Sequence, residues 1–245
     1  FLGTGAISST RIVARSLRLE RKPIRLKDSQ YFFFPFLSYK AYKPAPELLS
    51  FTLAEIFAEI RNPRFGPFFT HFQIYGLNSI FQQAIRAGFP PFLRWPILLD
   101  QIGKHFFLFQ GFLHSELSGR LEFTLESTEA MKDRVKIRGI ANPDSVRVAR
   151  GTQRLLRNKL LSHGLVPPFY LKMVPLGRSF HVGGSFPMGG EDPVFRSDRQ
   201  GRPAGLGRVH LLDAASFPSI PATTITFSIM ANSDRIVEET LRQSK

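Results

Sequence analysis

The sequence predicts an α/β framework at both ends of the chain and a strand-rich, antiparallel segment between them. Three observations lead to this fold class. Strand–turn–helix patterns occupy residues 1–17 and the stretch from 208 onward. Short runs in the middle alternate apolar and polar residues, which is the period of strands that bury one face. The strongest helical periodicity follows these runs, at 142–164.

The N-terminal stretch Phe1–Leu17 predicts the end of a buried strand, a glycine turn and a helix. Ser8 or Ser9 is expected to cap that helix, because a Ser hydroxyl accepts a hydrogen bond from a free N–H of the first turn. Residues 21–43 are predicted to be extended and interrupted by prolines.

The middle of the chain combines predicted helices with predicted strands. Apolar residues at helical spacing indicate a helix over 46–62, and Gly88 closes a second one over 79–88. Residues 70–76 alternate as in a strand. Further strands, which form an antiparallel sheet, are expected at 106–113, 119–126 and 133–140.

The last hundred or so residues return to helices and a strand. A helix is expected over 142–164, with Asp144 or Ser145 as its cap and Gly164 at its end. A strand over 208–213 and a final helix from Thr224 follow.

Composition excludes some functions and leaves others open. The 245 residues include no cysteine, so a disulfide framework, a zinc–thiolate site and a cysteine nucleophile are excluded. The net charge of +14 permits a nucleic-acid or membrane partner, but the basic residues are scattered, which favours a solvated surface. No apolar run reaches the roughly 18 residues of a membrane-spanning helix. The 25 phenylalanines fit a core, an apolar substrate cavity or a membrane-facing lip, with core as the default interpretation.

A histidine leads into a glycine-rich run at Phe180–Gly190, with the sequence FHVGGSFPMGG. Its four glycines make the run too flexible for a helix interior. No G-x-G-x-x-G or G-x-x-x-x-G-K-[ST] motif, which would bind nucleotide phosphates, occurs anywhere in the chain.

This run and the residues after it resemble the C-terminal signature of the glucose-methanol-choline (GMC) flavoprotein oxidoreductases. The matching elements occur in the family's order: His181-Val182-Gly183-Gly184, Asp213-Ala214, Phe217-Pro218-Ser219-Ile220-Pro221 and Arg235-Ile236. Gly5–Leu17 also resembles the family's second signature, although Thr10 stands where Pro or Ser is usual and Ser16-Leu17 replaces the closing Ser-Gly. The C-terminal block is specific, whereas the middle of the chain matches weakly.

The resemblance implies an α/β FAD-binding domain, incomplete and discontinuous here, plus an α+β substrate domain with an antiparallel sheet. Residues 1–20 would be a segment of the FAD domain, 21–165 the substrate-binding domain and 166–245 the return to the FAD domain with the catalytic histidine. In this family the glycine fingerprint for FAD lies near the N-terminus. We therefore expect the N-terminal part of a longer protein to precede Phe1.

The resemblance implies that His181 is the general base. Oxidising an alcohol to a carbonyl removes a hydride, which the flavin takes, and a hydroxyl proton, which a base must take. Histidine suits that role because its ordinary pKa of about 6.5 is close to working pH. Gly183 and Gly184 would let the backbone approach the flavin without a Cβ in the way. The alternative is a turn histidine that is hydrogen-bonded to a neighbouring loop.

Two further groups are implied to bind FAD. The N–H groups of Ile225 and Thr226, at the start of the last helix, would face the flavin pyrimidine and stabilise its negative charge. Asp213 and Ala214 would lie at the carboxyl end of a strand, where α/β sheets bind ligands. The alternatives are an ordinary Thr-capped helix and a plain turn residue.

Thr224 occupies the position of the family's second catalytic residue, which is usually Asn or His. A threonine takes no proton at neutral pH, so Thr224 either polarises the alcohol oxygen or caps the helix. His71 and His114 lie in aromatic segments and are core or edge residues, with lining of the substrate cavity as the alternative. No spacing of histidines or acids indicates a metal site.

The leading hypothesis is the C-terminal portion of an FAD-dependent oxidoreductase that oxidises a CH–OH group of a small alcohol or sugar. One alternative is a non-catalytic or split-gene fragment that acts only with a partner carrying the nucleotide-binding half. Another is a basic, aromatic-rich binder of nucleic acid or membranes, although neither a specific nucleic acid nor a membrane is indicated by a motif. The sequence does not identify the electron acceptor, the compartment or the oligomeric state.

Overall fold

The structure, a computed structural model, describes residues 1–41, 54–76, 103–126, 133–166 and 170–243. Its contacts divide the chain into two compact units. Unit 1 joins 1–30, 113–145 and 175–245, and unit 2 joins 31–112 and 146–174. The domain boundaries predicted at 20 and 165 rest on the family resemblance. They stay a prediction, because the two units are defined by contacts alone.

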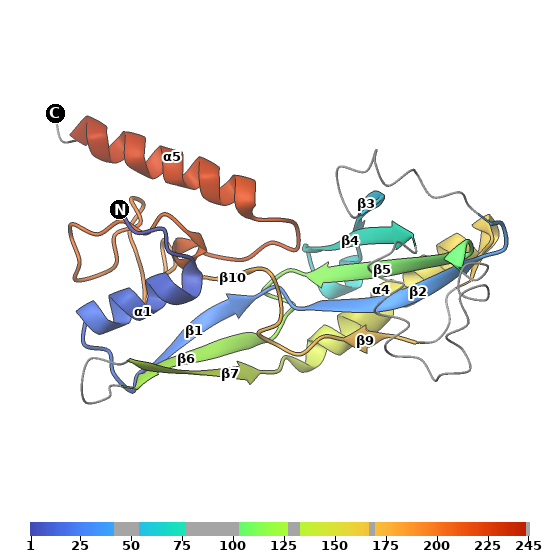
Figure 1. The fold of residues 1–245 in the computed structure, drawn as a ribbon, viewed down its shortest axis with the longest axis horizontal. Helices are drawn as coiled ribbons and strands as arrows, with labels where there is room; N and C mark the ends of the chain where they lie inside the picture. The colour runs from blue at the N-terminus through green and yellow to red at the C-terminus, as the bar shows by residue number, and fades with distance from the viewer. Residues whose placement is uncertain (42–53, 77–102, 127–132, 167–169, 244–245) are drawn as a thin grey trace. The chain divides into compact units, whose positions relative to one another are not determined.

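Unit 1 is built on a four-stranded antiparallel sheet with the order β10-β1-β6-β7 (Figure 1). The strands are β1 (Pro23–Asp28), β6 (Arg120–Glu126), β7 (Arg134–Ile140) and β10 (Val182–Gly183). One face of the sheet is apolar and packs against helix α1 (Ala6–Ser16). The buried residues of this core are Val13, Ala14, Leu19, Ile24, Leu26, Leu121, Phe123, Leu125, Phe186, Leu211 and Ala215. The strands predicted at 119–126 and 133–140 are confirmed.

Helix α1 starts earlier than the sequence suggests. It begins at Ala6, its N-cap is Gly5 with φ 87°, and no side chain caps it. The prediction that Ser8 or Ser9 is the cap is therefore wrong. Ser9 is instead fully buried within the first turns of the helix, where its hydroxyl donates a hydrogen bond to Asp213, which is distant in sequence.

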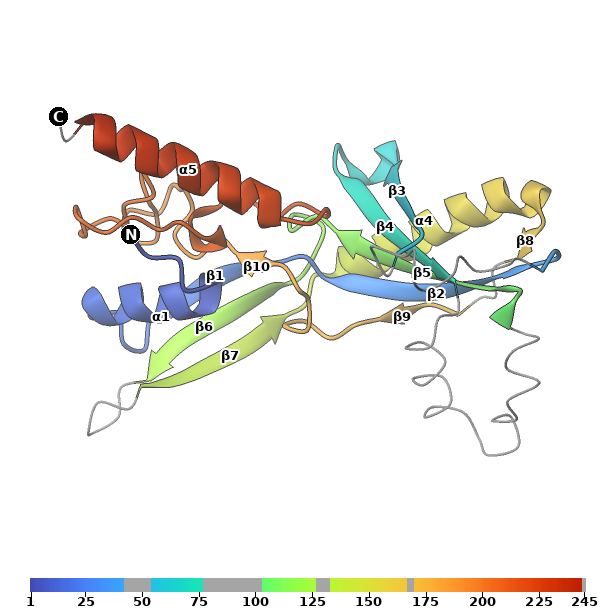
Figure 2. The same cartoon turned by 45° about the horizontal axis from the view of Figure 1, so that its top comes forward.

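The C-terminal part of unit 1 holds one long helix and little regular strand. Helix α5 (Thr226–Gln243) confirms the predicted final helix (Figure 2). The predicted strand over 208–213 is wrong as a regular element, because only Leu211 pairs there, in a parallel bridge with Leu2. The 3-10 turn η5 (Ala214–Ser216) follows directly.

Unit 2 contains a second antiparallel sheet with the order β3-β4-β5-β2-β8, and β9 also pairs with β2. Its strands are β2 (Tyr31–Ser38), β3 (Ile56–Arg61), β4 (Phe69–Gly76), β5 (Phe106–Leu113), β8 (Leu165–Val166) and β9 (Lys172–Met173). The core is aromatic: the rings of Phe36 and Phe109 are 4.3 Å apart, and Phe34 stacks on Phe109 at 5.6 Å. Core packing is thus confirmed for these phenylalanines, and the strands predicted at 70–76 and 106–113 are confirmed.

The helix predicted over 46–62 is wrong where the structure describes it. Residues 56–61 form strand β3, which pairs with β4 from Ile56 opposite Ile74 to Arg61 opposite Phe69. The short turn η2 (Pro63–Phe65) and Gly66, with φ 97°, close this hairpin. Hairpin pairing therefore overrides a helical spacing of apolar residues. The rest of that prediction, and the helix predicted over 79–88, lie outside the described residues.

Helix α4 (Pro143–Leu160) confirms the clearest helical pattern of the sequence. Its cap is Asn142, whose Oδ1 accepts the N–H of Asp144 at 3.0 Å, so the predicted caps Asp144 and Ser145 are wrong. Pro143 fills the first helical position, where its missing N–H costs nothing. Gly164 confirms the predicted end, with φ 77° after the turn η4 (Leu161–His163). Over the described residues, no helix has the length and apolar character to cross a membrane.

His71 lies buried on β4 among aromatic rings. Its ring stacks on Phe57 at 5.9 Å and lies 6.3 Å from Phe112, and its Nδ1 is 3.7 Å from the Glu59 carboxylate. Burial lowers the pKa of His71, and the Glu59 charge opposes this only in part. Burial also lowers the pKa of His114, whose Nδ1 accepts the Glu116 N–H at 3.2 Å. His71 is therefore buried and His114 partly buried, and the lowered pKa of each favours the neutral ring at neutral pH.

We expect the free energy of unfolding to decrease as pH falls below about 6.5, because the unfolded chain then binds a proton that folded His71 binds less tightly. His71→Phe keeps a ring between Phe57 and Phe112 and is expected to weaken this pH dependence. Denaturant unfolding at several pH values measures it, with His163→Gln at an exposed position as the control. The same pH slope in His71→Phe as in the parent protein would contradict the assignment.

Candidate active site

The glycine-rich segment that follows His181 is held from two sides. On one side β10 pairs with β1, with Val182 opposite Asp28 and Gly183 opposite Lys27. On the other side, backbone hydrogen bonds tie the segment to η5. They join Gly184 N to Ala214 O at 2.8 Å, Phe186 N to Ala215 O at 2.9 Å and Met188 N to Ser216 O at 2.8 Å. The segment is therefore a strap, residues 182–188, fixed between a sheet edge and a turn.

The strap requires glycine for reasons that lie within the chain. A Cβ at Gly183 would lie 2.3 Å from the carbonyl oxygen of Ala214, which is closer than real Cβ contacts. Gly184 has φ 64°, and a Cβ there would lie 3.1 Å from the carbonyl oxygen of Phe217. Both glycines thus permit the approach of the strap to η5. Their predicted role in leaving room for a flavin is not tested and stays a prediction.

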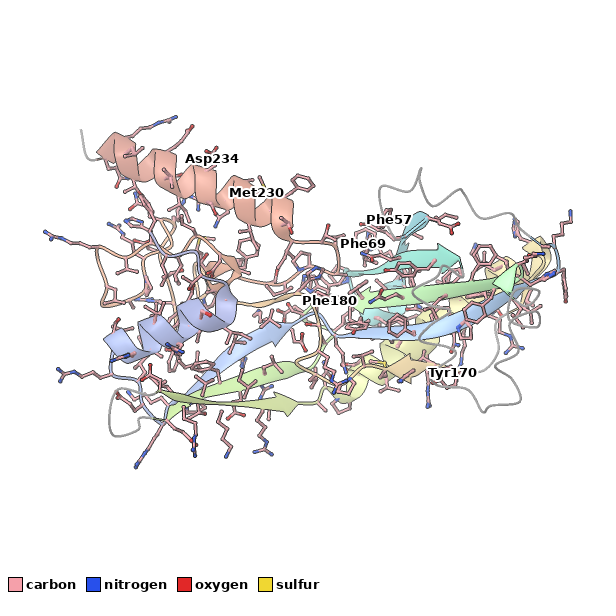
Figure 3. All side chains as sticks on the ribbon, in the orientation of Figure 1. Phe57, Phe69, Tyr170, Phe180, Met230 and Asp234 are labelled. Atoms are coloured by element: carbon pink, nitrogen blue, oxygen red, sulfur yellow. The ribbon has the colours of Figure 1, made fainter. Side chains whose placement is uncertain are left out.

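His181 lies directly before the strap. Its carbonyl oxygen accepts the N–H of Ser29 at 3.0 Å, which extends the pairing of β1 and β10 by one residue. Its side chain is half-buried, with Nδ1 shielded from solvent, whereas the preceding Phe180 is 73 % exposed (Figure 3). The imidazole is therefore attached to a fixed backbone at the border between core and solvent.

The buried carboxylate of Asp213 joins α1 to η5. Its Oδ1 accepts the N–H of Ala215 at 2.9 Å and so caps η5. Its Oδ2 accepts the hydroxyl of Ser9 from α1 at 2.5 Å. Thr10, the next residue of α1, contacts the hydroxyl of Ser185 in the strap at 2.6 Å. The Asp213 carboxylate is thus occupied by donors of this chain, and its predicted role in binding FAD stays a prediction.

The start of α5 is anchored by one apolar residue between two exposed ones. Ile225 is buried with Ala214, Phe217 and Ile220, and its carbonyl accepts the N–H of Ile229 at 2.9 Å. Thr224 and Thr226 on either side are exposed. Because α5 begins at Thr226 and the Thr224 side chain makes no hydrogen bond among the described residues, the structure does not place Thr224 as the helix cap.

The predicted site residues all belong to unit 1. They are His181, Gly183, Gly184, Asp213, Ala214, Thr224, Ile225 and Thr226. Direct contacts join the strap to η5, and the apolar cluster around Ile225 joins η5 to the start of α5. Sequence reasoning missed Ser9 and Ser185, because side-chain pairs between distant segments leave no local pattern. Among the described residues, no group of His, Cys, Asp and Glu could hold a metal ion.

The charged face of the unit 1 sheet carries part of the excess of basic residues. Across β6 and β7, Glu122 lies opposite Arg138 and Glu126 lies opposite Arg134. Cross-strand pairs of opposite charge stabilise an exposed sheet face modestly. The favoured interpretation of the charge as a solvated surface stays a prediction, as does the absence of a nucleic-acid or membrane partner.

Ser9→Ala is expected to lower the free energy of unfolding by about 1.5–3 kcal/mol, because it removes a buried hydrogen bond to a carboxylate. Ser8→Ala, one residue earlier on the exposed side of α1, is the control and is expected to change it by less than about 0.5 kcal/mol. Denaturant unfolding measures both. Equal effects of the two variants would show that the Ser9–Asp213 contact does not hold α1 to η5.

Comparisons with known proteins agree with this fold and say less about function. No protein-family model matches the chain, and no curated protein matches it. Among solved structures, the chain is similar to pyridoxine 4-oxidase from Mesorbium loti, with a TM-score of 0.56 and 17 % identity. The similarity covers 97 % of this chain and 50 % of that one, so the chain spans about half the length of the oxidase. The chain therefore has a fold similar to that of about half of this oxidase, built on antiparallel sheets with few helices. The α/β FAD-binding domain that the sequence resemblance implies stays a prediction.

Proposed function

We propose that this chain supplies the substrate-side part of the active site of an FAD-dependent oxidoreductase that oxidises a CH–OH group of an alcohol or sugar. The observation that carries the proposal is the strap. It fixes His181 on a backbone that is held from both sides, next to a turn whose apolar cluster also anchors the start of α5. The similarity of the fold to that of pyridoxine 4-oxidase supports an oxidoreductase.

The residues present fit one end of FAD. The start of α5 exposes Thr224 and Thr226 while Ile225 fixes the backbone, so the first N–H groups of the helix are available to a negatively charged ring. The sequence contains no phosphate-binding glycine loop for the other end. When bound, the flavin supplies the acceptor for the hydride of the substrate.

His181 performs the proton step in this proposal. A neutral imidazole accepts the hydroxyl proton while the C–H bond of the same carbon breaks, and such a base contributes roughly 10²–10⁴ in rate. The fixed backbone of His181 holds its Cα in place, which limits the positions that the ring can take during that step. Thr224 supplies a hydroxyl that polarises the alcohol oxygen, because a threonine donates or accepts a hydrogen bond but takes no proton.

Uncovered apolar surface in unit 1 supports the idea that a nucleotide-binding half completes the site. On α5, Phe227, Met230 and Leu241 are 81 %, 60 % and 57 % exposed. The second candidate function, a fragment that acts only with a partner that carries this half, rests on the same surface.

The chain purified on its own is expected to retain no stoichiometric flavin, because it has no loop for the pyrophosphate. Visible absorbance of the purified protein measures bound flavin. A stoichiometric flavin spectrum would contradict the claim that half of the cofactor site lies elsewhere.

In the flavin-loaded protein, which includes the nucleotide-binding half, His181→Ala is expected to slow flavin reduction by substrate by roughly 10²-fold or more. Flavin content should stay the same, because the imidazole acts on the proton and not on the cofactor. Stopped-flow absorbance measures the rate, with His163→Ala at an exposed position after α4 as the control. Flavin reduction at the parent rate in the His181→Ala variant would show that His181 is not the base. The second candidate function, a non-catalytic fragment, would then be favoured.

A further inference from the structure

A carboxyl group stands where the pattern of β1 calls for an apolar residue. Alternate residues of this strand face the core, and after Ile24 and Leu26 the third is Asp28, which is 0 % exposed. Burying a carboxylate costs free energy unless hydrogen bonds compensate for the lost water. The carboxyl group at this position therefore requires hydrogen-bond donors that a leucine would not need.

The Asp28 carboxylate binds the loop that leads to His181. Its Oδ1 accepts the hydroxyl of Ser179, and its Oδ2 accepts the N–H of Gly177 at 3.1 Å. Gly177 turns the chain with φ 79°, a left-handed conformation that favours glycine. Both oxygens are thus used on a loop that is distant in sequence, and none of these donors belongs to the apolar core.

The contacts continue from this carboxylate to the backbone of His181. The Ser179 hydroxyl lies 3.2 Å from the carbonyl oxygen of His181, and that oxygen also accepts the N–H of Ser29. Asp28 therefore touches both sides of the histidine: Val182 pairs with it in the sheet, and Ser179 binds its side chain.

We propose that Asp28 and Ser179 form a latch that positions His181. Asp28 is a positioning residue in this account, because it acts through Ser179 and the backbone and does not touch substrate. The inference rests on the proposed function in one respect, namely that the positioned imidazole is the base. The existence of the latch itself depends only on contacts within unit 1.

Burial and hydrogen bonding have opposite effects on the pKa of the Asp28 carboxyl. Burial raises the pKa of the Asp28 carboxyl, and the hydrogen bonds from Ser179 and Gly177 lower it in part. Each of these donors therefore stabilises the ionised form of the Asp28 carboxyl, because an ionised carboxylate accepts hydrogen bonds with both of its oxygens. Loss of one donor leaves a buried carboxyl group with fewer hydrogen-bond partners, so the effect should concentrate at the loop.

The test uses this chain without flavin, so that it does not depend on catalysis. Ser179→Ala removes one donor and is expected to speed amide hydrogen exchange at Ser29 and Gly177 by roughly tenfold or more. Phe123 in β6 should exchange at the parent rate, which separates a local opening from a global loss of stability. Ser179→Thr keeps a hydroxyl and should restore slow exchange, and Ser8→Ala is the control at an exposed site.

A second readout reports on the imidazole. In protein labelled at histidine, the ring signals of His181 should shift or broaden in Ser179→Ala and Asp28→Asn, and return in Ser179→Thr. Unchanged ring signals in both folded variants would overturn the latch, and so would faster exchange that is equal at Ser29, Gly177 and Phe123. If Asp28→Asn does not fold, the pair Ser179→Ala and Ser179→Thr decides the question.

The outcome is independent of the proposed function. If His181→Ala leaves flavin reduction unchanged, the base assignment fails, while exchange and ring signals still decide whether Asp28 and Ser179 position His181. If the base assignment holds, Ser179→Ala in the flavin-loaded protein should slow flavin reduction by roughly tenfold or more without loss of flavin. Parent-like reduction in Ser179→Ala would show that the latch does not serve catalysis.

Discussion

The close approach of the strap to η5 is the contact around which the candidate site of unit 1 is arranged. It is possible only because Gly183 has no Cβ where the carbonyl of Ala214 lies. Given that approach, the strap extends the sheet at β1, η5 receives the carboxylate of Asp213, and Asp213 holds α1 through Ser9. The start of α5 then packs on the same turn through Ile225. One glycine thus brings together segments from both ends of the chain.

The buried acids of this region serve structure, which leaves proton chemistry to the histidine. Asp213 and Asp28 are both buried, and each carboxylate accepts hydrogen bonds from the chain itself. A carboxylate whose oxygens are already used is poorly placed to accept a proton from substrate. His181 is the titratable residue of the glycine-rich run and lies at its solvent border. The arrangement therefore separates the groups that hold the site from the group proposed to react.

Regular patterns in the sequence predicted regular elements, and contacts between distant segments were missed. Strands β5, β6 and β7 and the helices α4 and α5 were found because each repeats its period over many residues. Strand β3 was mistaken for helix because its pairing with β4 outweighs a short helical spacing. The order of motifs placed the predicted site residues in one unit, and Gly183 and Gly184 pack closely against η5, while the roles of these residues toward a flavin stay predictions. Asp28 had a signal that could have been used, since it breaks the apolar alternation set by Ile24 and Leu26.

An experimental structure of the flavin-loaded protein with a substrate analogue tests the central claim most directly. The account predicts the analogue's oxygen within hydrogen-bond reach of the His181 imidazole, at about 2.6–3.2 Å. It also predicts the flavin pyrimidine at the first turn of α5, with the strap in its present contact with η5. A flavin bound away from the strap, or an analogue whose oxygen meets no atom of His181, would contradict it.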